Sequence, residues 1–147
     1  MGDLTTSTEA LAESTTDLQP GRAVSILGVP LGYGASMAGV DMGPAALRVA
    51  RLNERIAQLG YQVNDKGDLQ LERPRSPALA SDKLKYLSEI SKACEKLAVE
   101  VQAILQVGEF PIVLGGDHSI AIGSFAGAAC YYRKQQETLG LIWFDAH

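Results

Sequence analysis

The apolar positions of this chain fall into short runs that are separated by longer amphipathic stretches. Three runs, at residues 23–30, 111–114 and 141–144, are mostly apolar, and a shorter one covers 61–63. Runs of this length, bounded by glycine or polar residues, are typical of strands that a parallel sheet buries on both faces. Because helical patterns lie between the runs, the sequence predicts an α/β fold with a mostly parallel sheet.

Three amphipathic stretches predict the helices between these strands. The first covers 43–59, with a proline in its first turn and a glycine as its stop. The second runs from an N-cap at Ser81 toward Gly108, and its apolar residues recur every three or four positions. The third covers about 119–134 and carries glycine and alanine on one side, which predicts close packing against a neighbouring element.

Two stretches lack a helix or strand pattern. Residues 1–20 are rich in Thr, Ser, Glu and Asp, so we expect a disordered polar tail ahead of a single domain at 21–147. The spaced glycines at 32–39 predict a loop after the first strand. Their spacing matches neither the dinucleotide-binding fingerprint nor the Walker loop, which favours a plain turn-rich connection.

Composition narrows the class of protein. Hydrophobic residues make up 46% of the 147 residues and charged residues 20%, which is ordinary for a globular domain. The net charge of -4 argues against a nucleic-acid partner, and no apolar run is long enough to span a membrane. The two cysteines lie in apolar helical patterns, so we expect reduced core thiols and a cytoplasmic location.

The two histidines carry the candidate chemistry. Asp117 and His118 follow the run at 111–114, and Asp145 and His147 follow the run at 141–144. Taken singly, each pair is as consistent with a helix cap or a frayed end as it is with a functional site. Together they favour a site, because parallel strands present their carboxyl ends at one rim, and carboxylates and imidazoles are ligands of Mn²⁺, Fe²⁺, Ni²⁺ and Zn²⁺. The residues thus predict a metal-dependent hydrolase.

Two of these segments resemble hallmark motifs of a known family. Residues 114–124 and 142–147 resemble the metal-binding motifs of the ureohydrolase family, and within it Ala121 and Gly123 follow the arginases more closely than the agmatinases. Residues 39–48 also resemble the arginase segment after the first strand. The resemblance implies a three-layer α/β/α fold, of which 21–147 would be the N-terminal part.

The resemblance also implies the metal ligands. His118 would bind one ion, Asp145 would bridge two ions, and His147 would bind the second, whereas Asp117 would have a supporting role only. The ions would be two Mn²⁺, with Ni²⁺, Co²⁺ or Fe²⁺ as alternatives. A further ligand of the family falls two positions after His147, so the chain is expected to be an N-terminal fragment that is inactive alone.

The implied reaction is the hydrolysis of the L-arginine guanidinium to ornithine and urea by a hydroxide that bridges the two ions. The full-length protein would be a homo-trimer or hexamer. Two alternatives stay open at this point. One is another ureohydrolase that acts on agmatine, guanidine or a guanidino acid, and the other is a catalytically inactive truncated chain that acts as a binding partner.

Overall fold

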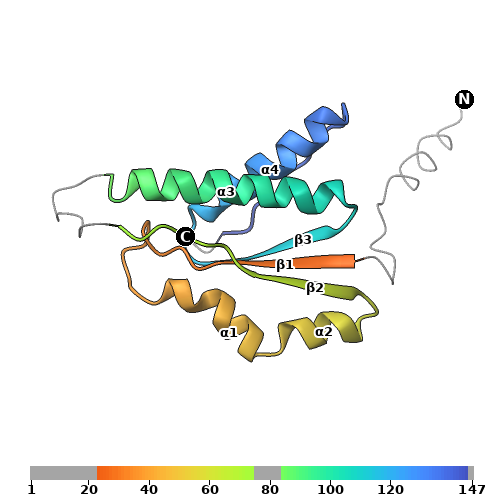
Figure 1. The fold of residues 1–147 in the computed structure, drawn as a ribbon, viewed down its shortest axis with the longest axis horizontal. Helices are drawn as coiled ribbons and strands as arrows, with labels where there is room; N and C mark the ends of the chain where they lie inside the picture. The colour runs from red at the N-terminus through yellow and green to blue at the C-terminus, as the bar shows by residue number, and fades with distance from the viewer. Residues whose placement is uncertain (1–22, 75–83, 146–147) are drawn as a thin grey trace, which may run out of the picture.

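A parallel three-stranded sheet forms the centre of the molecule. The structure, a computed structural model, describes residues 23–74 and 84–145. Strand β1 (Ala23–Val29) pairs with β2 (Gln62–Asp68) on one side and with β3 (Phe110–Gly115) on the other, in parallel both times (Figure 1). β1 is the central strand, and its residues beyond Ala23 are buried, as its apolar run predicts.

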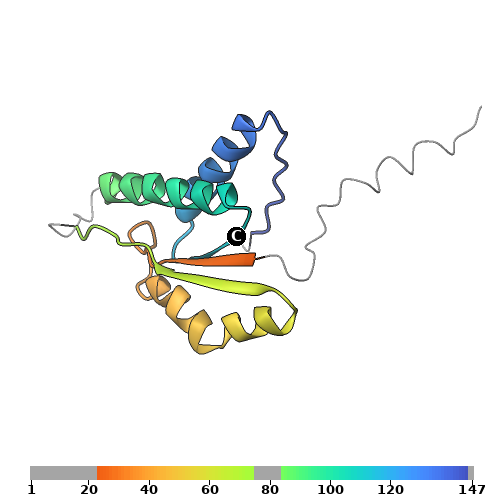
Figure 2. The ribbon, with the colours of Figure 1, turned by 45° about the vertical axis from the view of Figure 1, so that its right-hand side comes forward.

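Helices cover both faces of this sheet. Helices α3 (Leu87–Gln106) and α4 (Ile120–Lys134) lie on one face (Figures 1 and 2). The one-turn helix η1 (Val40–Met42) leads into α1 (Gly43–Val49) and α2 (Leu52–Gln58), which lie on the other face (Figure 2). The three layers confirm the predicted α/β fold with its parallel sheet.

The core is divided between the two faces because strand side chains alternate. Leu27 and Val29 of β1 pack with the buried face of α3, which includes Leu97 and Val101. Val24 and Ile26 belong to a second cluster, which includes Ile56 of α2 and Leu114 of β3. The alternation of side chains along β1 therefore determines which helices pack on each face of the sheet.

Helix α4 approaches α3 at backbone contact distance through two buried glycines. A Cβ at Gly123 would lie 2.6 Å from the carbonyl oxygen of Cys94, and one at Gly127 would lie 2.5 Å from that of Ala98. The Cys94 thiol also donates to the carbonyl oxygen of Ser119 over 3.2 Å, and burial raises the pKa of that thiol. The small-residue side of 119–134 is thus the helix-packing face that the sequence predicts.

The first predicted helix is interrupted. Residues 43–59 form two helices rather than one, because Arg51 adopts a left-handed conformation with φ of 62°. The strand predicted at 61–63 extends to Asp68. Its polar side chains are tolerated because β2 lies at the edge of the sheet, where solvent and Arg48 of α1 can hydrogen-bond to them. The N-cap predicted at Ser81 and the tail at 1–20 lie outside the described residues.

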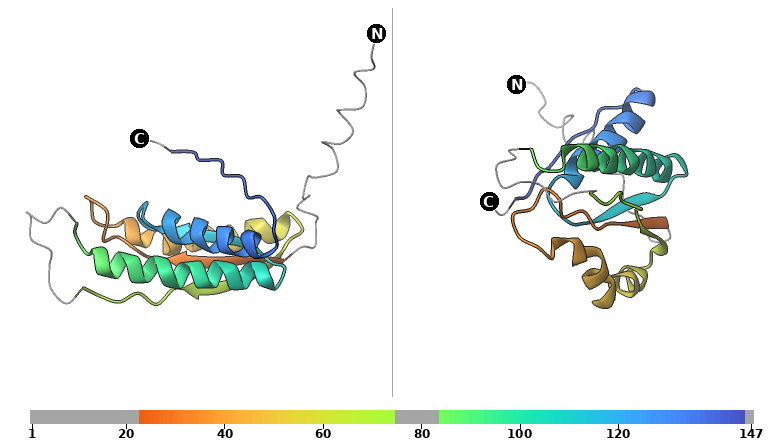
Figure 3. Two further views of the ribbon diagram at one scale, coloured as in Figure 1. Left: turned by 90° about the horizontal axis from the view of Figure 1, so that it is seen from above. Right: turned by 60° about the vertical axis from the view of Figure 1, so that its left-hand side comes forward.

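The strand predicted at 141–144 is absent from the described structure. Ile142 is 81% exposed and Phe144 is 93% exposed, and neither pairs with a strand. An extended apolar run becomes a strand only beside another strand, and the described part of β3 pairs with β1 alone. Figure 3 shows this segment as a coil that runs apart from the three strands.

No helix in the described ranges combines the length and apolar character that a bilayer crossing needs.

Candidate metal site

The turn between β3 and α4 places His118 at the carboxyl edge of the sheet. β3 ends at Gly115 and α4 begins at Ile120, so the intervening residues make a tight reversal. A Cβ at Gly116 would collide with the backbone of Leu31, which explains a glycine here. The side chain of His118 is 47% exposed and is therefore accessible to a solute.

Asp117 is directed into the protein rather than toward solvent. Only 7% of it is exposed. One carboxylate oxygen, Oδ2, accepts a hydrogen bond from the backbone N–H of Gly34 at 2.7 Å, and Oδ1 accepts one from the N–H of Ser119 at 2.9 Å. Its own N–H donates to the carbonyl oxygen of Leu31 at 2.7 Å. The residue therefore links the β3–α4 turn to the loop after β1.

His118 and Asp145 lie together although they are 27 positions apart in the sequence. His118 Nε2 is 3.8 Å from Asp145 Oδ2. The His118 ring stacks on Trp143 with centroids 5.0 Å apart, and Trp143 Nε1 donates to Asp145 Oδ2 at 3.2 Å. Asp145 reaches the site from a coil rather than from a strand end, and His147 lies outside the described residues.

A cavity of about 820 Å³ opens beside these two side chains. His118 and Asp145 line it together with Gly34, Ser36 and Met37 of the loop after β1. The sequence pattern predicts only a turn-rich connection for this loop and no part in the site. The signal for it was its position after the carboxyl end of β1, where ligands collect in parallel α/β sheets.

The donor pair fits a divalent cation. Two ligand atoms that each lie roughly 2.1 Å from one ion are at most about 4.2 Å apart, and the 3.8 Å between His118 Nε2 and Asp145 Oδ2 satisfies this limit. Imidazole and carboxylate are together a ligand set for Mn²⁺, Fe²⁺, Ni²⁺ or Zn²⁺. Within 23–74 and 84–145, no group of three His, Cys, Asp or Glu side chains is positioned to hold a metal ion.

Both cysteines are free, Cys94 buried and Cys130 partly so. Neither is among the residues that line the cavity. The donors beside the cavity are therefore nitrogen and oxygen atoms, which suits a hard or borderline ion better than a thiolate-bound one.

The chain is similar to known arginases. The arginase from Bacillus caldovelox is 46% identical over 127 residues, which are 86% of this chain and 41% of that protein. The arginase from Bacillus subtilis strain 168 is 44% identical over 126 residues, or 40% of its length. The native structure of the B. caldovelox enzyme at pH 5.6 superposes with a TM-score of 0.75, over 86% of this chain and 41% of that one.

The chain thus spans about two fifths of the length of these relatives. The sequence profile of the arginase family matches residues 22–147, which is most of the chain. These matches confirm the resemblance that the motifs at 114–124 and 142–147 suggested. On this ground, and with a fold to match, the chain belongs to the arginase family.

Proposed function

We propose that this chain forms part of an arginase-type hydrolase that cleaves the guanidinium of L-arginine to ornithine and urea. The single observation that carries the proposal is the approach of His118 Nε2 to Asp145 Oδ2 beside an open cavity. The similarity to proteins named arginase supports the substrate class, because arginine is a guanidino compound. The guanidinium of arginine is positively charged, and the Asp145 carboxylate beside the cavity carries the opposite charge.

His118, Asp145 and His147 are the residues that would hold the metal ions. Two divalent ions, when bound, supply a hydroxide nucleophile at neutral pH and offset developing negative charge. His118 presents Nε2 toward Asp145, and the stacked Trp143 ring limits the rotation of the imidazole. Trp143 also donates to the Asp145 carboxylate, and this hydrogen bond limits the rotation of a side chain that lines the cavity.

The finer parts of the proposal follow from the resemblance. The two ions are Mn²⁺, with Ni²⁺, Co²⁺ or Fe²⁺ as alternatives, and the assembled enzyme is a homo-trimer or hexamer in the cytoplasm. We assign the activity to the native gene product rather than to the 147-residue chain alone, because the relatives are more than twice as long as this chain. Agmatine, guanidine and a guanidino acid are the alternative substrates.

The experiment that tests this function measures urea. The native gene product, loaded with Mn²⁺, is expected to release urea and ornithine from L-arginine faster than it releases urea from agmatine or guanidinobutyrate. If the protein released urea from agmatine but not from L-arginine, its activity would be that of an agmatinase rather than an arginase. Absence of urea from all guanidino compounds, in a protein shown to hold Mn²⁺, would contradict the hydrolase proposal.

A second candidate function rests on the exposed apolar segment after α4. Leu141, Ile142, Trp143 and Phe144 are each at least half exposed. Such a contiguous apolar surface favours association with another polypeptide. The 147-residue chain would then be an inactive binding partner. Native protein that holds Mn²⁺ but releases no urea from any guanidino compound would favour this function over the hydrolase.

A further inference from the structure

The buried carboxylate of Asp117 has no part in the proposed reaction, yet it joins two segments that meet at the candidate site. Its two oxygens accept hydrogen bonds from two backbone N–H groups, of Gly34 and Ser119. Gly34 belongs to the loop after β1, and Ser119 precedes α4. We call this set of contacts the Asp117 clasp.

The clasp brings the two segments into backbone contact. A Cβ at Gly34 would lie 2.6 Å from Ser119 Oγ and 3.3 Å from both Asp117 carboxylate oxygens. The carbonyl oxygen of Leu31 accepts from the Asp117 N–H, so the loop is fixed at two points. The Ser119 hydroxyl can rotate away from a Cβ at position 34, but both Asp117 oxygens are held by hydrogen bonds. A branched side chain at this position would therefore push the loop away from the turn.

Each hydrogen bond of the clasp fixes a different wall of the cavity. The bond from Ser119 N–H to Asp117 Oδ1 closes a short turn that contains His118, so it fixes the backbone from which the imidazole projects. The bond from Gly34 N–H to Oδ2 fixes the start of the loop segment that includes Ser36 and Met37. These loop residues line the same cavity as His118 and Asp145.

We propose that Asp117 is a positioning residue that aligns His118 for metal binding and holds the Gly34–Met37 loop segment as a wall that contacts the guanidino substrate. The inference rests on the proposed function, since it needs a metal at His118 and a substrate in the cavity. Asp117 acts through backbone N–H groups and touches neither the metal nor the reacting atoms.

The variant Asp117→Asn tests the whole clasp. An amide has a single acceptor oxygen, so either Gly34 N–H or Ser119 N–H would face an NH₂ donor. We expect the Kd for Mn²⁺ to rise about tenfold, the usual scale for loss of a residue that supports a metal ligand. We also expect the KM for L-arginine to rise, and the Gly34 and Ser119 amides to exchange hydrogen faster even without metal.

The variant Gly34→Val tests the effect of the loop separately from the effect of His118. It pushes the exposed loop outward, while α4 stays anchored against α3 through Gly123 and Gly127. We expect the KM for L-arginine to rise while the Kd for Mn²⁺ stays within about twofold of the wild-type value. A split of this kind is not expected from a general loss of stability.

The matched control is Glu109→Gln, at the other end of the same sheet. Its carboxylate accepts from the Ser25 hydroxyl, and these groups lie beside the start of β3, away from the candidate site. This variant also exchanges a hydrogen-bonded carboxylate for an amide. We expect it to lower the melting temperature and to leave both the Kd for Mn²⁺ and the KM unchanged.

The outcomes separate the two proposals. If the native wild-type protein binds Mn²⁺ and releases urea, but Asp117→Asn has the wild-type Kd and KM, Asp117 is merely structural and the inference is overturned. If the wild-type protein binds none of Mn²⁺, Ni²⁺, Co²⁺ and Fe²⁺, the proposed function and the inference both fail. A raised Kd in Asp117→Asn, together with a raised KM alone in Gly34→Val, supports the inference.

Discussion

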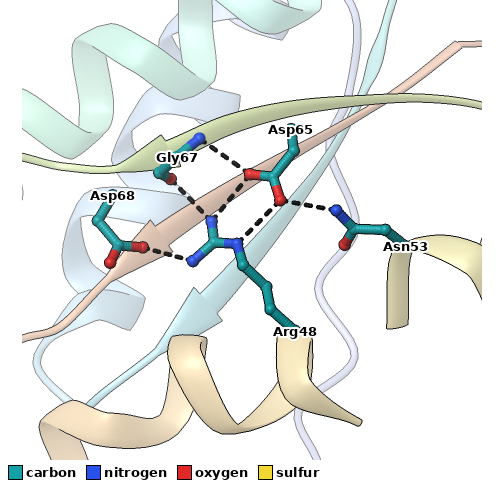
Figure 4. A network of polar contacts seen from close by, with 5 residues as sticks. All are labelled: Arg48, Asn53, Asp65, Gly67 and Asp68. Carbon is teal, nitrogen blue, oxygen red and sulfur yellow. Dashed lines mark hydrogen bonds and ion pairs between the residues drawn. The ribbon is translucent and has the colours of Figure 1, made fainter. Parts of the chain in front are cut away.

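Arg48 shows how one side chain connects two layers of this fold. Its guanidinium binds both carboxylate oxygens of Asp65, through Nε at 2.8 Å and Nη2 at 2.9 Å, and it reaches Asp68 at 2.6 Å (Figure 4). Asp65 also accepts from Asn53 of α2 at 2.7 Å and from the N–H of Gly67 at 2.9 Å. Figure 4 shows these residues converging from α1, α2 and β2, so the network fixes both short helices on the edge strand.

The same network makes stability depend on pH. The hydrogen bond from Arg48, helped by those from Asn53 and Gly67, holds the pKa of Asp65 well below its usual range, although partial burial opposes this effect. A lowered folded-state pKa contributes stability above the unfolded-state pKa, and this stability is lost as the pH falls toward the folded-state value.

We therefore expect Asp65→Asn to lower the free energy of unfolding by about 1 kcal/mol near neutral pH, since the ion pair is bidentate and partly buried. The difference from wild type should shrink as the pH falls below about 4, where unfolded aspartate is protonated. Urea denaturation at several pH values measures it. Glu54→Gln, which removes the exposed Arg51 pair, is the control and should change little.

At the scale of elements, the α3–α4 contact depends on the absence of side chains. Gly127 brings α4 close enough that a Cβ would lie 2.5 Å from the Ala98 carbonyl oxygen and 2.9 Å from Val101 Cβ. Backbone atoms cannot rotate away, so both helices would have to shift. Because α4 begins at Ile120, two residues after His118, such a shift would be transmitted to the β3–α4 turn.

We expect Gly127→Ala to destabilise the protein by about 1–3 kcal/mol, the usual range for overpacking in a closed contact. The control is Gly140→Ala, where a Cβ would meet nothing within 4 Å. Thermal unfolding of both variants measures the difference. Equal melting temperatures would show that the helices do not pack as closely as described.

The elements differ in how far the sequence predicts them. The apolar pattern was sufficient for β1, which is buried on both faces, and for β3 and α4, most of whose apolar residues are at least partly buried against their neighbours. It was insufficient for β2, whose Asn64 and Asp65 are polar because the strand lies at the sheet edge. It also missed the break at Arg51, where one continuous helix was predicted, since a single left-handed residue leaves no periodic signal.

The candidate site could be predicted only where it consists of residue types that a sequence pattern reveals. Asp–His pairs after apolar runs are visible in sequence, and the structure brings His118 and Asp145 within 3.8 Å. The loop wall at Gly34–Met37 carries no metal-ligand residue type, so only its place in the fold connects it to the cavity. The buried role of Asp117 likewise depends on backbone partners that a sequence pattern does not specify.

At the scale of the whole molecule, the chain presents apolar surface that its own described elements do not cover. Ile142 is 81% exposed within the 141–144 segment. The relatives are more than twice as long as the matched region, so in a longer protein further chain would be available to cover this segment. Exposed contiguous apolar residues favour association in water.

We expect the 147-residue chain, expressed by itself, to associate with rising concentration, and Ile142→Lys to reduce that association. Val49→Lys is the matched control, because Val49 is 84% exposed but lies on α1, on the opposite face of the sheet from α4. Sedimentation velocity over a concentration series measures both. A monomeric wild-type chain, or equal effects of the two lysine variants, would show that the 141–144 segment drives no association.

The binding of Mn²⁺ to the native gene product tests the central claim most directly, because His118 and Asp145 either share a cation or do not. Isothermal titration of the wild-type protein is expected to show saturable Mn²⁺ binding. We expect His118→Ala and Asp145→Ala each to raise the Kd for Mn²⁺ by more than the roughly tenfold expected for Asp117→Asn, since each removes a direct ligand rather than a supporting residue. Wild-type affinity for Mn²⁺ in either variant would contradict the metal-site assignment and, with it, the proposed hydrolase.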